Sequence, residues 1–290
     1  MPAYDTTGPI DAAIDLGAGH VEVVASDRAD VVAEVVPTNP SRDRDVSLAR
    51  EAAVSFDDGR LRVTVPQRRL LGPNASVDVR VQLPVRSRVQ VESGYGAVRT
   101  RGELGESRIT AKYGTVTGDT IGGLVLVSPY GQVDIDHIAG RLDVKAGHGH
   151  VRIGRVDDEA VLRGSHGSID LGTTAGPVTV TTSGRLTIDR ALGDVTAKSA
   201  HGAIRVREVA GGSVQIENGY AEVEVGVPAG LAAWLDASTR HGAVRNELTP
   251  DPETAASGRT VELRLRADWG DILVRRAEAR RSEARKETPA

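Results

Sequence analysis

Residues 124–140 read LVLVSPYGQVDIDHIAG, and residues 142–158 follow with the similar pattern LDVKAGHGHVRIGRVDD. Each segment carries a ring-bearing residue before a glycine, Tyr130-Gly131 in the first and His148-Gly149 in the second. Apolar residues two positions apart lie on both sides of that pair, which is typical of short strands with one buried face. The glycine supplies the positive φ of a tight turn. Each segment therefore predicts a strand, a turn, a second strand and a glycine-containing corner.

The same unit extends to both sides of these two segments. Its marker glycines recur with a fixed short period, and they lie in the pairs Tyr95-Gly96, Tyr113-Gly114, Tyr130-Gly131, His148-Gly149, His166-Gly167, Ser183-Gly184 and His201-Gly202. Further copies follow at Asn218-Gly219-Tyr220, at His241-Gly242 and at Trp269-Gly270. Within a unit the apolar positions hold register: we expect Val125, Val127, Val133, Ile135 and Ile138 to be buried in one unit and Leu142, Val144, Val151, Ile153 and Val156 in the next.

A unit of this size cannot bury its apolar face alone, so equivalent strands must stack about 4.8 Å apart in parallel sheets. The sequence therefore predicts an all-β fold, a parallel β-helix or β-solenoid with coils of about 17–18 residues. A propeller blade needs four strands and does not fit in a unit this short. The six-residue rhythm of left-handed hexapeptide helices is absent, so the general handedness of parallel crossovers favours a right-handed coil.

Three regions follow from where the period holds. Residues 1–84 keep the strand and turn pattern but lose the period, so we expect an irregular β cap with antiparallel pairing, including strands at 31–36 and 77–83. Residues 85–275 form the predicted solenoid. Trp234 and Trp269, near insertions at 228–233 and 250–258, are expected to plug its C-terminal end. Residues 276–290 are charged and lack an apolar stripe, which predicts a disordered tail.

Composition excludes several classes of protein. The net charge is −4, from 36 basic and 40 acidic residues, which is unlike the basic surface that nucleic-acid binding requires. There is no cysteine, so disulfide and thiol chemistry are absent. The N-terminus has neither a basic segment nor an apolar segment of the kind that makes a signal peptide, and no run of about 18 apolar residues occurs. We expect no membrane span and a cytoplasmic location.

Outward positions on the second strand of each unit predict a ladder of compensating charges. They are Arg99, Thr117, Asp134, Arg152, Asp170, Thr187, Arg205 and Glu224. Stacking never places two like charges side by side in this series, and each opposite pair contributes about 0.2–1 kcal/mol. We interpret this ladder as structural.

Outward positions on the first strand are different, because they are nearly uncharged. Apart from Asp143, they are Gln90, Thr110, Leu126, Val161, Thr179, Thr196 and Gln215, which we take as a candidate interaction face. A flat surface of this kind can bind a protein or polymer partner, or a second copy of the chain. The alternative is that Thr and Val are there because they suit strands.

The candidates for chemistry are weak. His148, His166, His201 and His241 share one turn position, and stacking would bring His148 and His166 about 5 Å apart. No carboxylate recurs at a fixed offset beside them, so stacked rings explain the series without a metal. Asp134, Asp136, Asp143 and Asp170 resemble the carboxylates of glycan-processing β-helices, but they are dispersed, and Arg152 interrupts them. We assign no catalytic, metal or cofactor residues and expect a protein that is not an enzyme.

The units of the form Tyr/His-Gly-x-Val/Ile-x-Val/Ile resemble a bacterial β-strand-repeat family of unknown function whose members are named putative adhesins. The segments Tyr4–Ile10 and Ile14–Val21 are similar to actinobacterial members. The resemblance covers nearly the whole chain and implies an extracellular, surface-bound binding protein with no catalytic residues. Together these observations favour a non-enzymatic scaffold or adhesin-like interaction protein. The alternatives are a carbohydrate-binding or carbohydrate-active β-helix protein and metal-dependent assembly through the histidines.

Overall fold

The computed structural model of this chain describes residues 3–66, 75–248 and 260–277. Within them the fold is all-β, as predicted, with one large and mostly parallel sheet and one helix, α1 (Asp43–Glu51). The strands of the first half are β1 (Ala3–Asp5), β2 (Asp11–Ala18), β3 (Val21–Ser26), β4 (Asp30–Pro37), β5 (Ala53–Asp57), β6 (Arg60–Thr64), β7 (Val77–Pro84), β8 (Arg88–Ile138) and β9 (Leu142–Val156). Those of the second half are β10 (Ala160–Thr174), β11 (Val178–Thr182), β12 (Arg185–Ala191), β13 (Val195–Ser199), β14 (Ile204–Val206), β15 (Gly212–Asn218), β16 (Val223–Val227), β17 (Ala232–His241), β18 (Val244–Asn246), β19 (Thr260–Trp269) and β20 (Ile272–Arg276).

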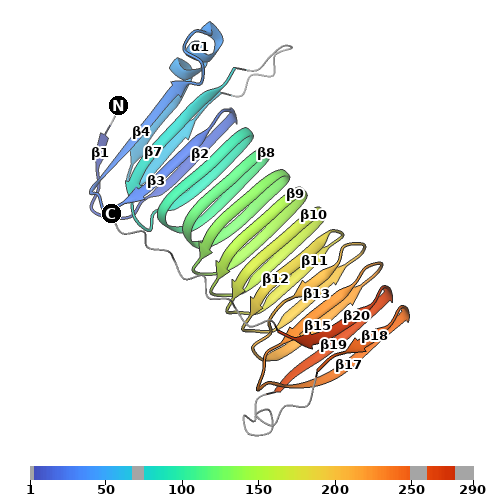
Figure 1. Ribbon diagram of the computed structural model, residues 1–290. Coiled ribbons are helices and arrows are strands. Elements are labelled where there is room, and N and C mark those ends of the chain that lie inside the picture. The colour runs from blue at the N-terminus through green and yellow to red at the C-terminus, as the bar shows by residue number, and fades with distance from the viewer. Residues whose placement is uncertain (1–2, 67–74, 249–259, 278–290) are drawn as a thin grey trace, which may run out of the picture.

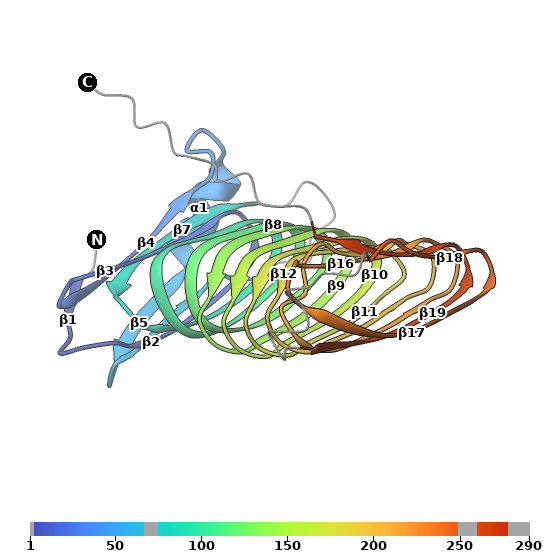
Figure 2. The ribbon, with the colours of Figure 1, turned by 60° about the horizontal axis from the view of Figure 1, so that its bottom comes forward.

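In the middle of the chain each strand pairs in parallel with the strand one unit later. Leu124 of β8 faces Leu142 of β9, Leu142 faces Ala160 of β10, and Ala160 faces Val178 of β11. The first two of these steps equal the interval that separates the marker glycines Gly131, Gly149 and Gly167, and the third is one residue longer than the interval from Gly167 to Gly184. Figure 1 shows the strands as successive layers along an elongated molecule. Figure 2 shows that the chain curves back in each layer, so that two faces enclose a common interior.

The interior is filled by aliphatic side chains. Leu142, Val144 and Ile153 are fully buried, and the equivalent positions of neighbouring layers carry Val, Ile, Leu or Ala. Burial of one such side chain contributes about 1.5–3 kcal/mol, so the layers are held together by many equal contacts along the stack. The tyrosines at the marker turns, in contrast, are exposed.

The marker glycines are required by how closely the turns stack. Gly149 has a φ of 142°, and a Cβ atom on it would lie 1.8 Å from the carbonyl oxygen of Gly131 in the preceding layer. A Cβ atom on Gly131 would lie 2.0 Å from the carbonyl oxygen of Gly114, and one on Gly167 would lie 1.9 Å from that of Gly149. No other residue fits where the turns stack this closely, which is why the marker recurs from layer to layer.

At both ends of the stack the order of strands in space departs from their order in the chain. Strands β2 and β3 pair in parallel with β8 on one side and with β6 and β7 on the other. Likewise β19 and β20 lie between β15 and β16 on one side and β17 and β18 on the other. In each case the first or last unit of the chain is inserted next to the regular layers, and the neighbouring unit lies outside it (Figure 1).

The N-terminal end is more regular than a cap of antiparallel strands. The expected strands at 31–36 and 77–83 are present as β4 and β7, and β1–β4, β4–β7 and β5–β6 are antiparallel. Strands β2 and β3 nevertheless carry the alternation of the regular units and join them in parallel. Helix α1 was not predicted. It is fixed by the buried carboxylate of Asp45, which accepts a hydrogen bond from the Ser76 amide at 3.1 Å.

The prediction that the tryptophans plug the C-terminal end is wrong. Trp234 is 52% exposed and Trp269 is 50% exposed, because both occupy outward positions. Trp269 stacks on His241 with 3.8 Å between ring centroids. The predicted insertion at 250–258 and residues 278–290 of the predicted tail lie outside the described residues. Among the described residues no helix has the length and apolar character to cross a membrane.

Candidate functional site

The predicted interaction face needs one correction of strand phase. Leu126 was expected to point outward, but it is fully buried and faces the buried Val144. Val125 and Val127, which were expected to be buried, instead take the outward positions and are only partly buried, and Val125 faces Asp143. The segment Leu124–Val127 is uninterrupted apolar sequence, so it fits either phase, and the longer leucine side chains fill the interior.

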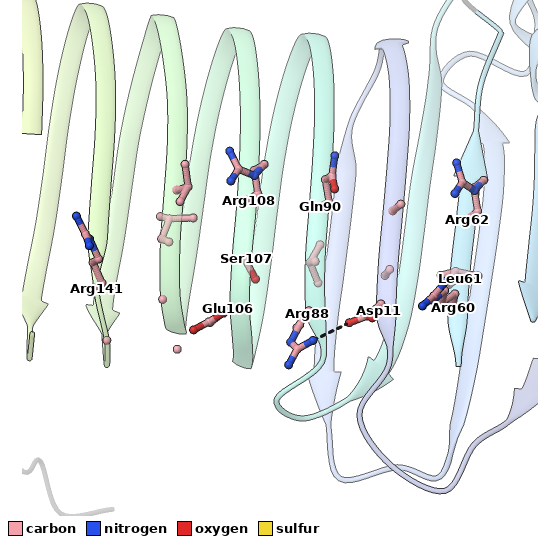
Figure 3. A pocket seen from close by; sticks show the side chains of 18 of the residues that line it. Asp11, Arg60, Leu61, Arg62, Arg88, Gln90, Glu106, Ser107, Arg108 and Arg141 are labelled. Carbon is pink, nitrogen blue, oxygen red and sulfur yellow. Dashed lines mark ion pairs between the residues drawn. The ribbon is translucent and has the colours of Figure 1, made fainter. Parts of the chain in front are cut away.

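The outward residues of this face form one continuous line, which we call the central row. Tyr95 stacks on Tyr113 and Tyr113 on Tyr130, so the strand segments that precede these rings lie side by side within β8. This places Arg108 beside Gln90, as Figure 3 shows, and Thr110 at the next outward position along its strand rather than in the row. From the N-terminal end the row reads Arg62, Ala13, Gln90, Arg108, Val125, Asp143, Val161, Thr179, Thr196 and Gln215.

The second half of the central row matches the predicted face. Val161, Thr179, Thr196 and Gln215 are consecutive in it, each on the strand after the last. Thr179 and Gln215 are exposed or partly exposed along the row, whereas Val161 is 9% exposed. This stretch is uncharged, as expected, but it is shorter than the sequence pattern indicated.

The first half of the central row borders a groove that sequence reasoning missed. Its volume is about 1100 Å³, and it extends over the layers from β6 to β9. Gly122, Gly123 and Gly140 lie along it and leave it room, because they carry no side chains. Figure 3 shows Arg62, Gln90 and Arg108 at one height in the groove, with Gln90 and Arg108 side by side and the strand of Ala13 between Gln90 and Arg62. No single stretch of sequence signals this groove, since its residues come from strands that are far apart in the chain.

Charges along the edge of the groove alternate in sign. Asp57 faces Arg60, Arg60 faces Asp11, and Asp11 faces Arg88. Arg88 lies 3.8 Å from the carboxylate of Asp11, and Arg141 further along lies 3.4 Å from that of Glu159. Asp11 therefore has a basic partner of its own, whereas Glu106 and Asp158, which also line the groove, have no ion pair among the described residues.

The central row has a surplus of hydrogen-bond donors. Its acidic member, Asp143, is paired with Arg163 at 3.5 Å. Within the described residues neither Arg62 nor Arg108 has a carboxylate within ion-pair distance. Guanidinium groups bind carboxylates in a bidentate way. Gln90 lies between the two arginines in the row, and its Nε2 donates to the Glu92 carboxylate at 3.4 Å. The groove is thus suited to an acidic group.

The predicted charge ladder on the other face is in the expected register. Asp134 faces Arg152, Arg152 faces Asp170, and Arg205 faces Glu224. Glu224 is 6% exposed and accepts hydrogen bonds from Arg205 and, at 2.7 Å, from Arg275. Burial acts to raise the pKa of Glu224, but the two guanidinium groups outweigh it and hold the pKa below its ordinary value. The charged side chains of this ladder pair with one another between neighbouring layers, so we interpret the ladder as structural.

The ring-bearing residues at the marker turns form a stacked line, which we call the ring ladder. Tyr95, Tyr113 and Tyr130 stack with centroids 4.8 and 5.0 Å apart, and His148 and His166 continue the series at 5.3 and 5.0 Å. The spacing of about 5 Å expected for the two histidines is confirmed. Because the planes lie within 6° of parallel, each ring covers its neighbour's face, and the ring edges are exposed.

Metal ligands and paired carboxylates do not gather among the described residues. No three His, Asp or Glu side chains there are arranged to hold a metal ion. His150 is 2.5 Å from the Ser168 hydroxyl and 3.5 Å from Asp170, and His137 is 2.7 Å from Asp157. The hydrogen bond from His137 is the main cause of a lowered pKa at Asp157, and Arg155 adds to it against the opposing effect of burial.

The four aspartates considered for glycan chemistry lie on different surfaces. Asp143 is in the central row, whereas Asp134 and Asp170 are on the opposite strand series with Arg152 between them. Asp136 lies two residues beyond Asp134, exposed on the same strand. The structure brings together no acid and base pair from this set.

Comparisons with known proteins find similar structures but no related sequence. No family model and no curated protein matches the chain. A putative cell adhesion protein from Clostridium sporogenes aligns over 95% of this chain and 98% of its own, with 11% identity and a TM-score of 0.28. A putative adhesin from Parabacteroides distasonis aligns over 94% and 95%, with 14% identity and a TM-score of 0.36. A putative lipid binding protein from the same species aligns over 96% and 94%, with 11% identity and a TM-score of 0.28.

Proposed function

We propose that this chain is a parallel β-solenoid that works as a non-enzymatic interaction protein, with the groove and central row as its binding surface. The fold proposal rests on parallel pairing between strands one unit apart, layer after layer. The functional proposal rests on one observation. The guanidinium groups of Arg62 and Arg108, which have no carboxylate partner among the described residues, lie in a groove that continues into the central row. A right-handed coil stays a prediction.

The shape of the surface favours a long partner. Ten residues make up the central row, and at the strand spacing of about 4.8 Å they span about 43 Å. A small molecule would occupy a fraction of that length. An extended polymer can place acidic groups at the arginines and uncharged groups over Val161, Thr179 and Thr196. We therefore propose an extended chain carrying carboxylate groups as the ligand class.

Two carboxylate polymers test this function and separate the sources of such a chain. Binding of poly-L-glutamate and of polygalacturonate to the full-length protein is measured by calorimetry at low and at physiological salt. Replacement of both Arg62→Ala and Arg108→Ala should weaken binding at least about tenfold, since hydrogen bonds to charged groups contribute about 1.5–3 kcal/mol each. Added salt should weaken it further.

The matched control is Arg185→Ala, which removes an exposed arginine on β12 outside the groove. Its affinity should equal that of the unaltered protein. Preference for poly-L-glutamate indicates an acidic protein segment, and preference for polygalacturonate indicates a glycan. Failure of both polymers to bind, or equal loss in the Arg185 variant, would refute the proposal.

A further inference from the structure

The ring ladder has a gap of one position at Ser183. Rings continue without a break from Tyr95 to His166, and they resume with His201, which stacks on Tyr220 at 5.3 Å. Between them the marker turn carries Ser183, whose side chain has no ring. The backbone links all three turns: the Ser183 amide donates to the Ser165 carbonyl, and the Gly202 amide donates to the Ser183 carbonyl. Ser183 therefore occupies the position of a ring in the series.

The gap has the size of one aromatic ring. His166 and His201 belong to turns two layers apart, which is about 9.6 Å at the ordinary strand spacing. The same two-layer interval separates Tyr95 from Tyr130, and Tyr113 fills it with stacking distances of 4.8 and 5.0 Å. A ring inserted at Ser183 would have two neighbours, as Tyr113 has.

The walls of the gap are held in place by buried polar side chains. The Thr182 hydroxyl accepts a hydrogen bond from the Gly184 amide at 3.0 Å, beside Ser183. The Ser199 hydroxyl donates to the Gly184 carbonyl at 3.0 Å and accepts from the Gly202 amide at 3.1 Å. These hydrogen bonds fix the turns on both sides, so binding of a ring should cost little conformational entropy of the protein.

A hollow lies beside Ser183, although neither His166 nor His201 is among the residues that line it. It has a volume of about 520 Å³, and Thr182, Ser183 and Ser199 are among the residues that line it. His166 and His201 are themselves exposed. The position is therefore open to solvent, and the next rings of the ladder on its two sides are His166 and His201.

We propose that the gap at Ser183 is a binding site for one planar aromatic group, which stacks between His166 and His201 and completes the ring ladder. The chemistry is that of a flat ring and is shared by an aromatic side chain of a protein partner and by a free heteroaromatic molecule. Stacking of aromatic pairs contributes about 0.5–1.5 kcal/mol beyond area burial, which corresponds to about 2- to 13-fold in affinity for each ring face.

The test follows the imidazole signals of the full-length protein by NMR during titration with two probes. N-acetyl-tryptophanamide stands for a protein side chain and adenosine for a free heteroaromatic. We expect ring-current shifts of the His166 and His201 signals, and no shift of the His137 signal. His166→Ala and His201→Ala should each weaken binding about 2- to 13-fold.

The decisive variant is Ser183→Tyr, which fills the gap with a ring of the protein's own. It should abolish the shifts and raise the unfolding temperature, and the latter result shows that the variant is folded. Ser41→Tyr, at an exposed position just before α1 and outside the ring ladder, is the matched control and should bind like the unaltered protein. The absence of shifts with both probes, or equal binding by the Ser183 variant, would overturn the proposal. Tighter binding of N-acetyl-tryptophanamide would indicate an aromatic side chain of a protein partner, and tighter binding of adenosine a free heteroaromatic molecule.

Discussion

The carboxylate of Glu224 accepts a hydrogen bond of 2.7 Å from Nε of Arg275, a residue 51 positions later in the chain. Glu224 lies on β16 and Arg275 on β20, the strand that is inserted between β16 and β18. Because Arg205 on β14 bonds to the same carboxylate, one buried group connects three consecutive layers. The last unit of the chain is thereby tied to the regular part of the stack.

Replacement Glu224→Gln should lower the free energy of unfolding by about 1–3 kcal/mol, because it removes the charge that two guanidinium groups share. The measurement is urea unfolding followed by circular dichroism. Glu217→Gln is the control, since Glu217 forms an ion pair with Lys198 at 2.9 Å and both side chains are about half exposed. That variant should lose less than about 1 kcal/mol. Equal losses in the two variants would contradict the structural role of Glu224.

Stability should also depend on pH in the acid range. The pKa of Glu224 in the folded state lies below its ordinary value of 4.5, so its contribution is present above about pH 4.5 and is lost as pH falls through the lower folded-state value. Asp157, whose pKa is lowered from 3.8 chiefly by His137, acts in the same direction. The urea midpoint should therefore fall between about pH 5 and about pH 3. In the Glu224→Gln variant the fall should be smaller, and an identical fall would show that Glu224 is not its source.

Substitution of a marker glycine should be far more damaging than substitution of a glycine elsewhere. In Gly149→Ala the new Cβ would lie 1.8 Å from the Gly131 oxygen at a φ of 142°, so the stacked turns must separate. We expect a loss of roughly 2–5 kcal/mol. Gly8→Ala is the control, since no atom lies within 4 Å of its Cβ position, and it should change stability by less than about 0.5 kcal/mol. Thermal unfolding measures both.

Removal of an internal ring from the ring ladder should cost more than removal of a terminal one. Tyr113 stacks on rings at both faces, whereas Tyr220 stacks on His201 at one face. Tyr113→Ala should therefore lose about 1–3 kcal/mol and Tyr220→Ala about half as much. Chemical denaturation of the two variants gives the comparison. A larger loss from Tyr220 would mean that stacking is not what the ladder contributes.

The period of the repeat was sufficient to predict which residues are neighbours in successive layers of the regular part. The regular spacing of the units places His148 next to His166 and Asp134 next to Arg152, and both neighbours are found. The period cannot predict the order of the end units, because any unit with the same alternation can pair with any edge strand. Insertion of β2 between β6 and β8, of β3 between β7 and β8, and of β19 between β15 and β17 depends on which long connections the chain can make.

The groove could not be predicted for a related reason. It places Ala13 between Arg62 and Gln90, because β2 is inserted between β6 and β8. A unit-by-unit pattern from residue 89 onward contains only part of that surface. The wrong prediction that Leu126 points outward has a different cause. Residues 124–127 are all apolar, so the alternation of apolar and polar residues does not show which of them are buried.

The phase of β8 is itself testable with two adjacent and chemically similar changes. Leu126→Thr places a hydroxyl in the aliphatic interior, where Leu126 is fully buried, and removes apolar burial, so it should cost about 2–4 kcal/mol. Val125→Thr alters the neighbouring outward position, where Thr179 and Thr196 already stand in the same row, and should change stability by less than about 0.5 kcal/mol. Urea unfolding of both variants decides between the two phases. If Val125→Thr were the damaging change, the outward row would run through Leu126, and Val125 could not be part of the proposed binding surface.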